Sequence, residues 1–186
     1  MTQLPYRIKP GYNGIVIELP DNAIVADVGF GGDPVKGATY YIDMDLEESI
    51  HRNGEVAAAV PREKFIQCDV DKSNIPLPDK CCDFVVASHI AEHIHEPEHL
   101  CSEMERIGKA GYIETPGIVV ELMSNYPHHL WWVTKVSDKI IFIKKPAFFT
   151  DNGWKVPCVF PFNILYHLFR NTCYRWDGEI KRVVIG

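Results

Sequence analysis

Five short, mostly apolar segments recur along the first two thirds of the chain, and their ends are marked by glycines, acids, a histidine or a proline. The segments are AIVADVGF (23–30), TYYIDMD (39–45), KFIQCDV (64–70), CDFVVASH (82–89) and AGYIETP (110–116). Near-continuous apolar runs of this length are typical of strands in a parallel sheet that is buried on both faces. We therefore predict a sheet of this kind as the centre of the fold.

Helical patterns fall between some of these segments. The better one spans 97–109, where Pro97 suits a first helical position and Leu100, Met104 and Ile107 form an apolar stripe. A second helix is predicted over 46–60. Alternation of strands and helices implies right-handed crossovers. The expected class is α/β, a Rossmann-like open, mostly parallel sheet flanked by helices.

The last third of the chain has a different pattern. HLWWVTKVSDKIIFIKK (129–145) predicts an antiparallel hairpin around Ser137-Asp138, followed by a helix over 162–171 and a strand over 179–185. No repeat or linker divides the chain, so we expect one domain over 1–186. Its first 22 residues are expected to form an arm, and 127–186 to supply the hairpin, a loop and the last helix and strand.

A glycine-rich loop, Asp27-Val-Gly29-Phe-Gly31-Gly32-Asp33-Pro34, directly follows the first predicted strand. Glycines let a backbone turn tightly and approach a ligand, and ligands of open α/β sheets bind at the carboxyl ends of strands. Alone, the loop fits a plain turn equally well. No Gly-Lys-Ser/Thr follows, which excludes a P-loop.

Two acids end the next two predicted strands. Asp43 ends the second, where a carboxylate can accept hydrogen bonds from ribose hydroxyls. Asp69 follows the third, where it can accept a bond from an adenine amino group. Either acid alone fits a solvated side chain at a strand end.

Taken together, these segments resemble the class I S-adenosylmethionine-dependent methyltransferases of the type 11-like kind. The resemblance rests on VADVGFGGDP, YYIDMD and CDVDKSNIPLPDKCCDFVVASHIAEHIHEPEHLCSEMERIGKAGYIETP, within 23–116. It implies S-adenosyl-L-methionine as the cofactor and an EC 2.1.1.- activity. The implied cofactor-binding residues are Asp27, Gly29, Gly31, Asp43, Met44, Asp69, Val70 and Ser88.

The resemblance also implies that Ser88 and His89 close the site near the sulfonium. His89 is the candidate catalytic base, needed only if the acceptor is a weak nucleophile such as a sugar hydroxyl. A histidine that only lines the pocket fits as well. His128, His129, Trp131 and Trp132 are candidates for an acceptor pocket, although the tryptophans fit a hairpin packed on the sheet somewhat better.

The sequence departs from the family pattern at two points. Asp33 occupies the place of the third glycine, and the seven residues 33–39 are too few for the helix that normally links the first two strands. We expect an open loop there, as in a subgroup of small bacterial methyltransferases with a shortened first-strand loop. That weaker resemblance favours O-methylation of a small-molecule or glycan acceptor.

Three alternatives stay open. A non-catalytic S-adenosylmethionine-binding protein fits the altered loop. His89-Ile-Ala-Glu92-His93 matches the H-x-x-E-H pattern of zinc hydrolases, but His89 follows a strand too closely for the helix that such a site needs, so we assign no metal. An NAD-dependent oxidoreductase is disfavoured by the loop pattern.

Charge and apolar patterning bear on partners. The net charge of -6 disfavours nucleic acid as a partner, no apolar run is long enough to cross a bilayer, and the N-terminus lacks the apolar core of a secretory signal. The six cysteines contain no C-x-x-C pair, which favours a reducing, cytoplasmic setting. The oligomeric state is not readable from the sequence.

Overall fold

The centre of the protein is a six-stranded sheet with the strand order β10-β7-β6-β3-β4-β5. The computed structural model describes residues 6–10, 14–47, 59–151 and 170–186. The bounds of the central strands are β3 Val25–Val28, β4 Tyr40–Asp43, β5 Phe65–Gln67, β6 Cys82–Ser88, β7 Gly108–Pro116 and β10 Asn171–Asp177. Four of the five apolar segments contain one of these strands, and the fifth, 110–116, lies within β7, which begins two residues earlier; the predicted strands are therefore confirmed.

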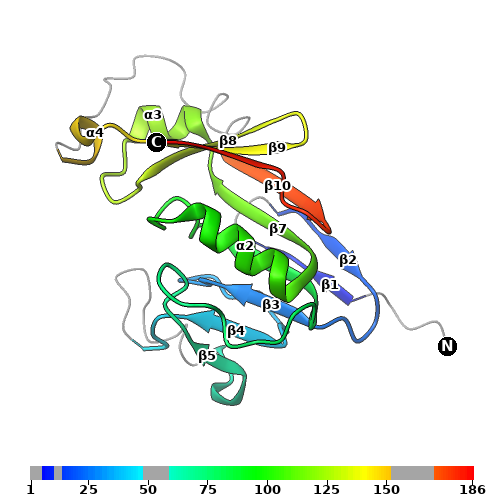
Figure 1. Ribbon diagram of the computed structural model, residues 1–186. Coiled ribbons are helices and arrows are strands. Elements are labelled where there is room, and N and C mark those ends of the chain that lie inside the picture. The colour runs from blue at the N-terminus through cyan, green and yellow to red at the C-terminus, as the bar shows by residue number, and fades with distance from the viewer. Residues whose placement is uncertain (1–5, 11–13, 48–58, 152–169) are drawn as a thin grey trace.

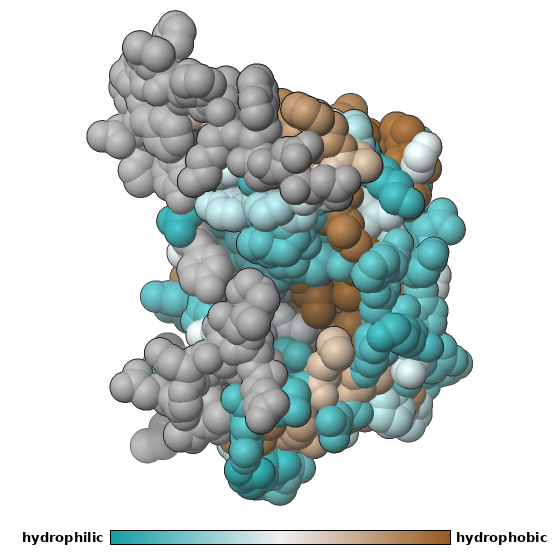
Figure 2. Space-filling model, turned by 90° about the vertical axis from the view of Figure 1, so that its left-hand side faces the viewer, coloured by the Kyte–Doolittle hydropathy of each residue, from teal (hydrophilic) through white to brown (hydrophobic). Residues whose placement is uncertain are grey.

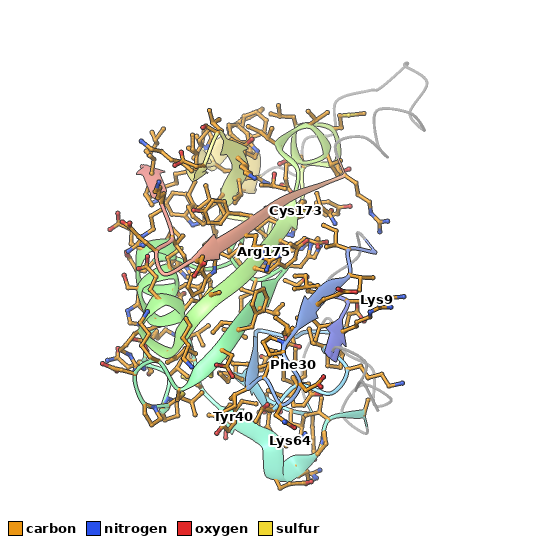
Figure 3. The ribbon with its side chains drawn as sticks, turned by 90° about the vertical axis from the view of Figure 1, so that its right-hand side faces the viewer. Lys9, Phe30, Tyr40, Lys64, Cys173 and Arg175 are labelled. Carbon is orange, nitrogen blue, oxygen red and sulfur yellow. The ribbon has the colours of Figure 1, made fainter. Side chains whose placement is uncertain are left out.

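Neighbouring strands of the sheet run parallel, except that β10 pairs antiparallel with β7. Figure 3 shows β10, with Cys173 and Arg175, lying along β7 at one side of the sheet. The predicted mostly parallel α/β fold is therefore confirmed. Because β3 to β7 run the same way, their carboxyl ends and the loops that follow meet at one edge.

The strands bury both of their faces, as the apolar runs predict. On β6, Val85 and Ala87 belong to one apolar cluster, and Phe84 and Val86 to another on the opposite face. Side chains of successive strand residues point to opposite faces, so an unbroken apolar run is what a sheet covered on both sides requires.

Helix α2, Pro97–Ile107, covers the first of these faces (Figure 1). Its buried stripe of Leu100, Met104 and Ile107 packs in the same cluster as Val85. The helix ends two residues before the predicted end, because β7 begins at Gly108.

The opposite face is covered by a short hairpin of β1, Tyr6–Ile8, and β2, Ile17–Leu19. The expected N-terminal arm therefore contains a structured segment, since Ile8, Ile17 and Leu19 are buried in the cluster of that face.

A smaller sheet of order β11-β9-β8 lies beside the central one (Figure 1). Strands β8, Trp131–Val136, and β9, Lys139–Lys144, form the predicted hairpin, with Ser137 at a φ of 56° in the turn. Strand β11, Arg182–Ile185, corresponds to the predicted last strand and pairs parallel with β9.

Some elements differ from the predictions or fall outside the described residues. The sequence interpretation missed β10, helix α3, Ile118–Ser124, and helix α4, Ala147–Asp151. Most of the helices predicted over 46–60 and 162–171 lies outside the described residues; η1, Arg62–Lys64, is a short 3-10 turn before β5.

Residues 29–39, between β3 and β4, form turns without a helix, as expected. No helix within the described ranges is both long and apolar enough to cross a membrane.

Candidate functional site

A cavity of about 880 Å³ opens at the carboxyl edge of the central sheet. Figure 2 shows the face of the molecule that is hollowed there, with apolar side chains within and polar ones around it. All but one of the nine residues that the sequence assigns to the site line this cavity. They are Gly29, Gly31, Asp43, Met44, Asp69, Val70, Ser88 and His89.

The first-strand loop turns at two glycines with positive φ, 64° at Gly29 and 48° at Gly31. A Cβ atom added to Gly29 would lie 1.9 Å from Cδ1 of Ile90, whereas one added to Gly31 meets no heavy atom closer than 4.0 Å. Gly29 is therefore required by both backbone conformation and space. At Gly31 only the backbone conformation favours glycine.

Asp27 is the exception among the predicted residues, because it lies beneath the loop and does not line the cavity. Its Oδ2 accepts a 2.6 Å hydrogen bond from the amide of Val35. Burial raises the pKa of Asp27 to about 7, against the opposing effect of the Val35 bond. Asp27 thus ties the two ends of the glycine loop together.

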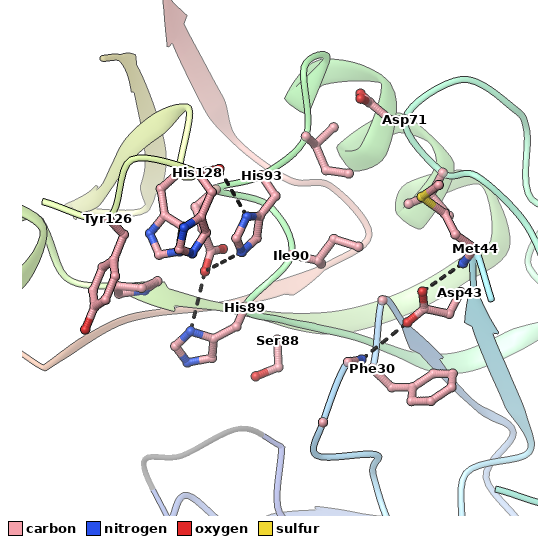
Figure 4. Close-up of a pocket in the computed structure, with 18 of the residues that line it drawn as sticks. Phe30, Asp43, Met44, Asp71, Ser88, His89, Ile90, His93, Tyr126 and His128 are labelled. Atoms are coloured by element: carbon pink, nitrogen blue, oxygen red, sulfur yellow. Dashed lines mark hydrogen bonds and ion pairs between the residues drawn. The ribbon is translucent and has the colours of Figure 1, made fainter. Parts of the chain in front are cut away.

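Asp43 lies at the exit of β4 and is held by the loop opposite. Its Oδ2 accepts a bond from the amide of Gly31 at 3.3 Å, and its Oδ1 accepts one from the amide of Met44 at 2.8 Å (Figure 4). The side chain of Met44 is 59% exposed on the cavity wall. This pair suits a ligand with two different rings. The carboxylate can accept hydrogen bonds from a polar ring, and the apolar side chain can pack against a flat ring.

Asp69 and Val70 follow β5 at the same edge. Oδ2 of Asp69 pairs with the ammonium group of Lys72 at 2.8 Å, which lowers the pKa of Asp69. Val70 is buried but contributes to the cavity wall. Asp69 is therefore ionised at neutral pH, and its charge is shared with Lys72.

His89 lies between two buried carboxylates at the exit of β6. Its Nδ1 is 3.4 Å from Oε1 of Glu92, and its Nε2 is 3.3 Å from Oε1 of Glu114. Burial alone would lower the pKa of His89, but the two carboxylates outweigh it and raise the pKa to about 9. His89 also has a φ of 54°, so the chain turns sharply at the cavity.

Glu114 was missed by the sequence interpretation, although an acid two residues before a proline at a predicted strand end was a usable signal. It is fully buried on β7, where it also accepts bonds from the hydroxyl of Tyr112 at 2.6 Å and from the amide of Asn171. Asn171 and its neighbour Arg170 both line the cavity.

A second buried network was missed for a different reason. Glu121 of α3 accepts bonds from Nδ1 of His129 and from Nζ of Lys145, each at 2.5 Å. These residues are 8 and 24 positions from Glu121, and only the packing of α3 against the hairpin brings them together. Glu121, inside the apolar run IVVELM, was the available sequence signal.

The H-x-x-E-H segment does not form the helix of a zinc hydrolase. Residues 89–93 form a bend and a turn, closed by a 2.9 Å bond from the amide of His93 to the carbonyl of Ile90. His128 and His129 line the cavity as the acceptor interpretation expects. Trp131 is buried in the core and bonds to the carbonyl of Ile94, so the packing interpretation applies to it.

The cavity wall fits the cofactor that the sequence resemblance implies. Acids at the ends of successive strands, Asp43 and Asp69, line one side together with the exposed Met44. Asp33, also on the wall, adds a further carboxylate, whose pKa is raised by burial and by Glu114. Acidic and apolar groups together suit a nucleoside that carries a sulfonium charge.

Residues 27–113 match the family model described as a methyltransferase domain. The match begins at Asp27 and ends within β7, so it contains the loop, both strand-end acids and His89. Among curated proteins, none matches the chain.

Several solved structures are similar to part of the chain. A putative methyltransferase from an antibiotic biosynthesis pathway of Anabaena variabilis is 23% identical, with a TM-score of 0.40, over 55% of this chain and 42% of that one. A S-adenosylmethionine-dependent methyltransferase from Aquifex aeolicus is 20% identical, with a TM-score of 0.38, over 52% and 57%. The chain thus spans less than two thirds of the length of both structures.

A third similar structure is a chain of the complex between the Haloferax volcanii Trm112 methyltransferase activator and a putative methyltransferase. It is 15% identical, with a TM-score of 0.49, and the match covers 87% of this chain and 84% of that one.

Proposed function

The chain contains a class I S-adenosylmethionine-dependent methyltransferase domain over residues 27–113, and from this premise we propose that it is an enzyme that methylates an oxygen of a small-molecule or glycan acceptor. S-adenosyl-L-methionine is the cofactor of this domain. When bound, its sulfonium group carries the methyl group that is transferred. We further propose that the described part of the chain works as one domain.

The observation that carries the proposal is the single cavity shared by the glycine loop, Asp43, Asp69 and His89. In the sequence these four features are up to 60 residues apart, and each alone fits a surface turn or a solvated side chain. Their convergence at the carboxyl edge of a parallel sheet is the arrangement expected of a ligand site in an open α/β fold.

We assign the nucleoside to the side of the cavity formed by Asp43 and Met44. The carboxylate of Asp43 would hold the ribose hydroxyls, the exposed thioether of Met44 would lie against adenine, and the Asp69-Val70 segment would meet the adenine edge. Gly29 and Gly31 would leave room for the methionine part, with Asp27 fixing the loop from below.

Ser88 and His89 would then lie next to the reacting centre. Holding the acceptor in line with the sulfonium is the main task, because proximity and orientation can supply about 7–11 kcal/mol of the barrier. His89 is the proposed general base for a hydroxyl acceptor. Its raised pKa makes it a stronger base that is mostly protonated at neutral pH.

The acceptor would occupy the side of the cavity away from Met44. That side is lined by polar and aromatic groups, including Tyr126, His128, Arg170 and Asn171. Flat rings and hydrogen-bonding side chains suit a sugar or a similarly polar small molecule, which supports O-methylation of such an acceptor.

Calorimetry with S-adenosylmethionine and S-adenosylhomocysteine tests the proposal. We expect a dissociation constant in the micromolar range, which corresponds to a binding free energy of about -8 kcal/mol. Transfer of labelled methyl groups to a panel of sugars, phenols and amines then identifies the acceptor class. Absence of cofactor binding at millimolar ligand would overturn the assignment of this cavity.

The second candidate function is cofactor binding without catalysis. It is favoured by Asp33, a carboxylate on the cavity wall at the position where the family has its third glycine. Cofactor binding without turnover on any acceptor class would support it.

A further inference from the structure

Three histidines meet on the wall of the cavity, away from Asp43 and Met44. The ligand nitrogens of His93, His128 and His129 lie within 4.8 Å of one another. His93 comes from the turn after β6, whereas His128 and His129 come from the segment before β8. Figure 4 shows His93 and His128 together, with Asp43 and Met44 across the cavity.

The three rings are packed on one another. His93 and His128 are stacked with ring centroids 5.3 Å apart, and His129 meets both edge-on, at 4.5 Å and 4.6 Å. A tetrahedral metal ion with bonds of about 2.0–2.1 Å needs nitrogens roughly 3.3 Å apart. Small side-chain rotations would close that difference, and they are easiest at the exposed His128.

Two of the histidines are oriented by hydrogen-bond acceptors at Nδ1. Nδ1 of His93 donates to the carbonyl of His128 at 3.3 Å, and Nδ1 of His129 donates to Glu121 at 2.5 Å. Carbonyl and carboxylate oxygens accept only, so the proton is on Nδ1 and the lone pair of each neutral ring is on Nε2. Metal-binding histidines almost always have such an outer partner.

A buried carboxylate beside the cluster provides a second, independent observation. Glu92 is 1% exposed, and within the described ranges neither of its oxygens accepts a hydrogen bond. Its Oε1 lies 4.0 Å from Nε2 of His93 and 3.4 Å from Nδ1 of His89. The other ring nitrogen of His89 contacts Glu114. Within the described ranges the charge partner of Glu92 is therefore His89, which it shares with Glu114. A metal ion next to His93 would give this buried carboxylate a second cationic partner.

We propose that His93, His128 and His129 bind a divalent transition-metal ion, with Glu92 as a fourth ligand or as the acceptor of a metal-bound water. Imidazole nitrogens favour Zn²⁺ and its neighbours Co²⁺ and Ni²⁺, whereas Mg²⁺ and Ca²⁺ prefer oxygen ligands. When Glu92 accepts from a metal-bound water, the three protein nitrogens leave an open position, as in catalytic zinc sites.

This ligand set is not that of the H-x-x-E-H pattern. The sequence interpretation assigned no metal, and its zinc alternative required His89 and His93 on one helix. The proposed site uses His93 with two histidines 35 and 36 residues later, and it assigns His89 to the carboxylates of Glu92 and Glu114.

The position of the ion also suggests a role, and this inferred role depends on the proposed methyl transfer. It would face the acceptor side of the cavity, where it would bind an acceptor hydroxyl and lower the pKa of that group. The binding site itself stands on the histidine geometry and requires no cofactor.

The test is calorimetry of Zn²⁺ with the full, untagged chain after chelator treatment, in the absence of cofactor and acceptor. We expect one Zn²⁺ per chain, with affinity reduced at least 100-fold in His93→Ala and in His128→Ala, and 10- to 100-fold in Glu121→Gln. Replacing Zn²⁺ by Co²⁺ should give the absorption bands of a tetrahedral site.

His99→Ala is the matched control, since His99 lies on the same stretch of chain but outside the cluster. It should bind Zn²⁺ like the unmodified chain. Circular dichroism and urea denaturation confirm that each variant is folded. Because His128 is exposed, His128→Ala keeps the test valid if a buried variant unfolds. Less than 0.2 equivalents of bound Zn²⁺, or unchanged affinity in His93→Ala and His128→Ala, would overturn the proposal, whatever the outcome for cofactor binding.

Discussion

Nε2 of His89 lies 3.3 Å from Oε1 of Glu114, a carboxylate that is completely buried on the neighbouring strand. The register of the sheet creates this contact, because Ser88 pairs with Glu114 at the carboxyl end of β6. With Glu92 on the other side of the ring, the pKa of His89 rises to about 9, although burial alone would lower it. The proposed base is therefore held in its protonated form at neutral pH.

This charge state predicts the pH dependence of methyl transfer. Only the neutral imidazole can accept a proton, and its fraction rises about tenfold per pH unit below the pKa of His89. We expect kcat/KM to rise between pH 7 and 9 and to level off above the pKa. The rise should disappear in His89→Asn, a substitution that tolerates the φ of 54° at this position. An unchanged slope in His89→Asn would mean that His89 only lines the cavity.

Asp43 should determine cofactor affinity. Hydrogen bonds to a charged acceptor contribute about 1.5–3 kcal/mol, so Asp43→Ala should weaken S-adenosylmethionine binding about 10- to 100-fold. Calorimetry measures the change. Asp45→Ala is the matched control, because Asp45 is two residues away and does not line the cavity. Equal losses in the two variants would contradict the assigned role of Asp43.

The glycine loop should tolerate a side chain at one position better than at the other. Gly29→Ala adds a Cβ 1.9 Å from Ile90 at a φ of 64°, so we expect a loss of about 2–4 kcal/mol in the free energy of unfolding. Gly31→Ala has the same backbone strain but open space, and should cost about 1 kcal/mol. Urea denaturation measures both losses, and equal values would show that contact with Ile90 does not matter.

Burial of Asp27 should make the stability of the cofactor-free protein depend on pH. The pKa of Asp27 is raised from 3.8 to about 7, so the folded state disfavours the ionised form. The resulting destabilisation is absent below pH 3.8, grows as pH rises, and is complete above pH 7 at about 4 kcal/mol.

Asp27→Asn removes this ionisation while keeping an oxygen that can accept the Val35 bond. We expect the variant to be more stable than the unmodified chain at pH 8, and similar to it at pH 4, in urea denaturation. A variant that is less stable at both pH values would show that the charged form of Asp27 is favoured by the loop.

The sequence alone determined the central strands and the edge of the sheet at which the cavity opens. Apolar runs that end in glycines and acids specify buried parallel strands locally, because burial on both faces needs no information from distant residues. Helix α2 was equally readable from its proline and apolar stripe. Strand β10 was not, since its alternating pattern gains meaning only when it pairs antiparallel with β7.

Only the tertiary structure decided the chemistry of the histidines. The stretch ASHIAEHIHEPEH contains one carboxylate partner of His89, Glu92, but the sequence does not show that they meet. The other partners of His89 and His93 lie 25 to 36 residues away. Glu114 reaches His89 through the register of β6 and β7, and His128 and His129 reach His93 through the segment before β8. The physical reason is that a pKa or a metal site depends on charges and lone pairs within a few ångströms in space, and those distances are set by packing.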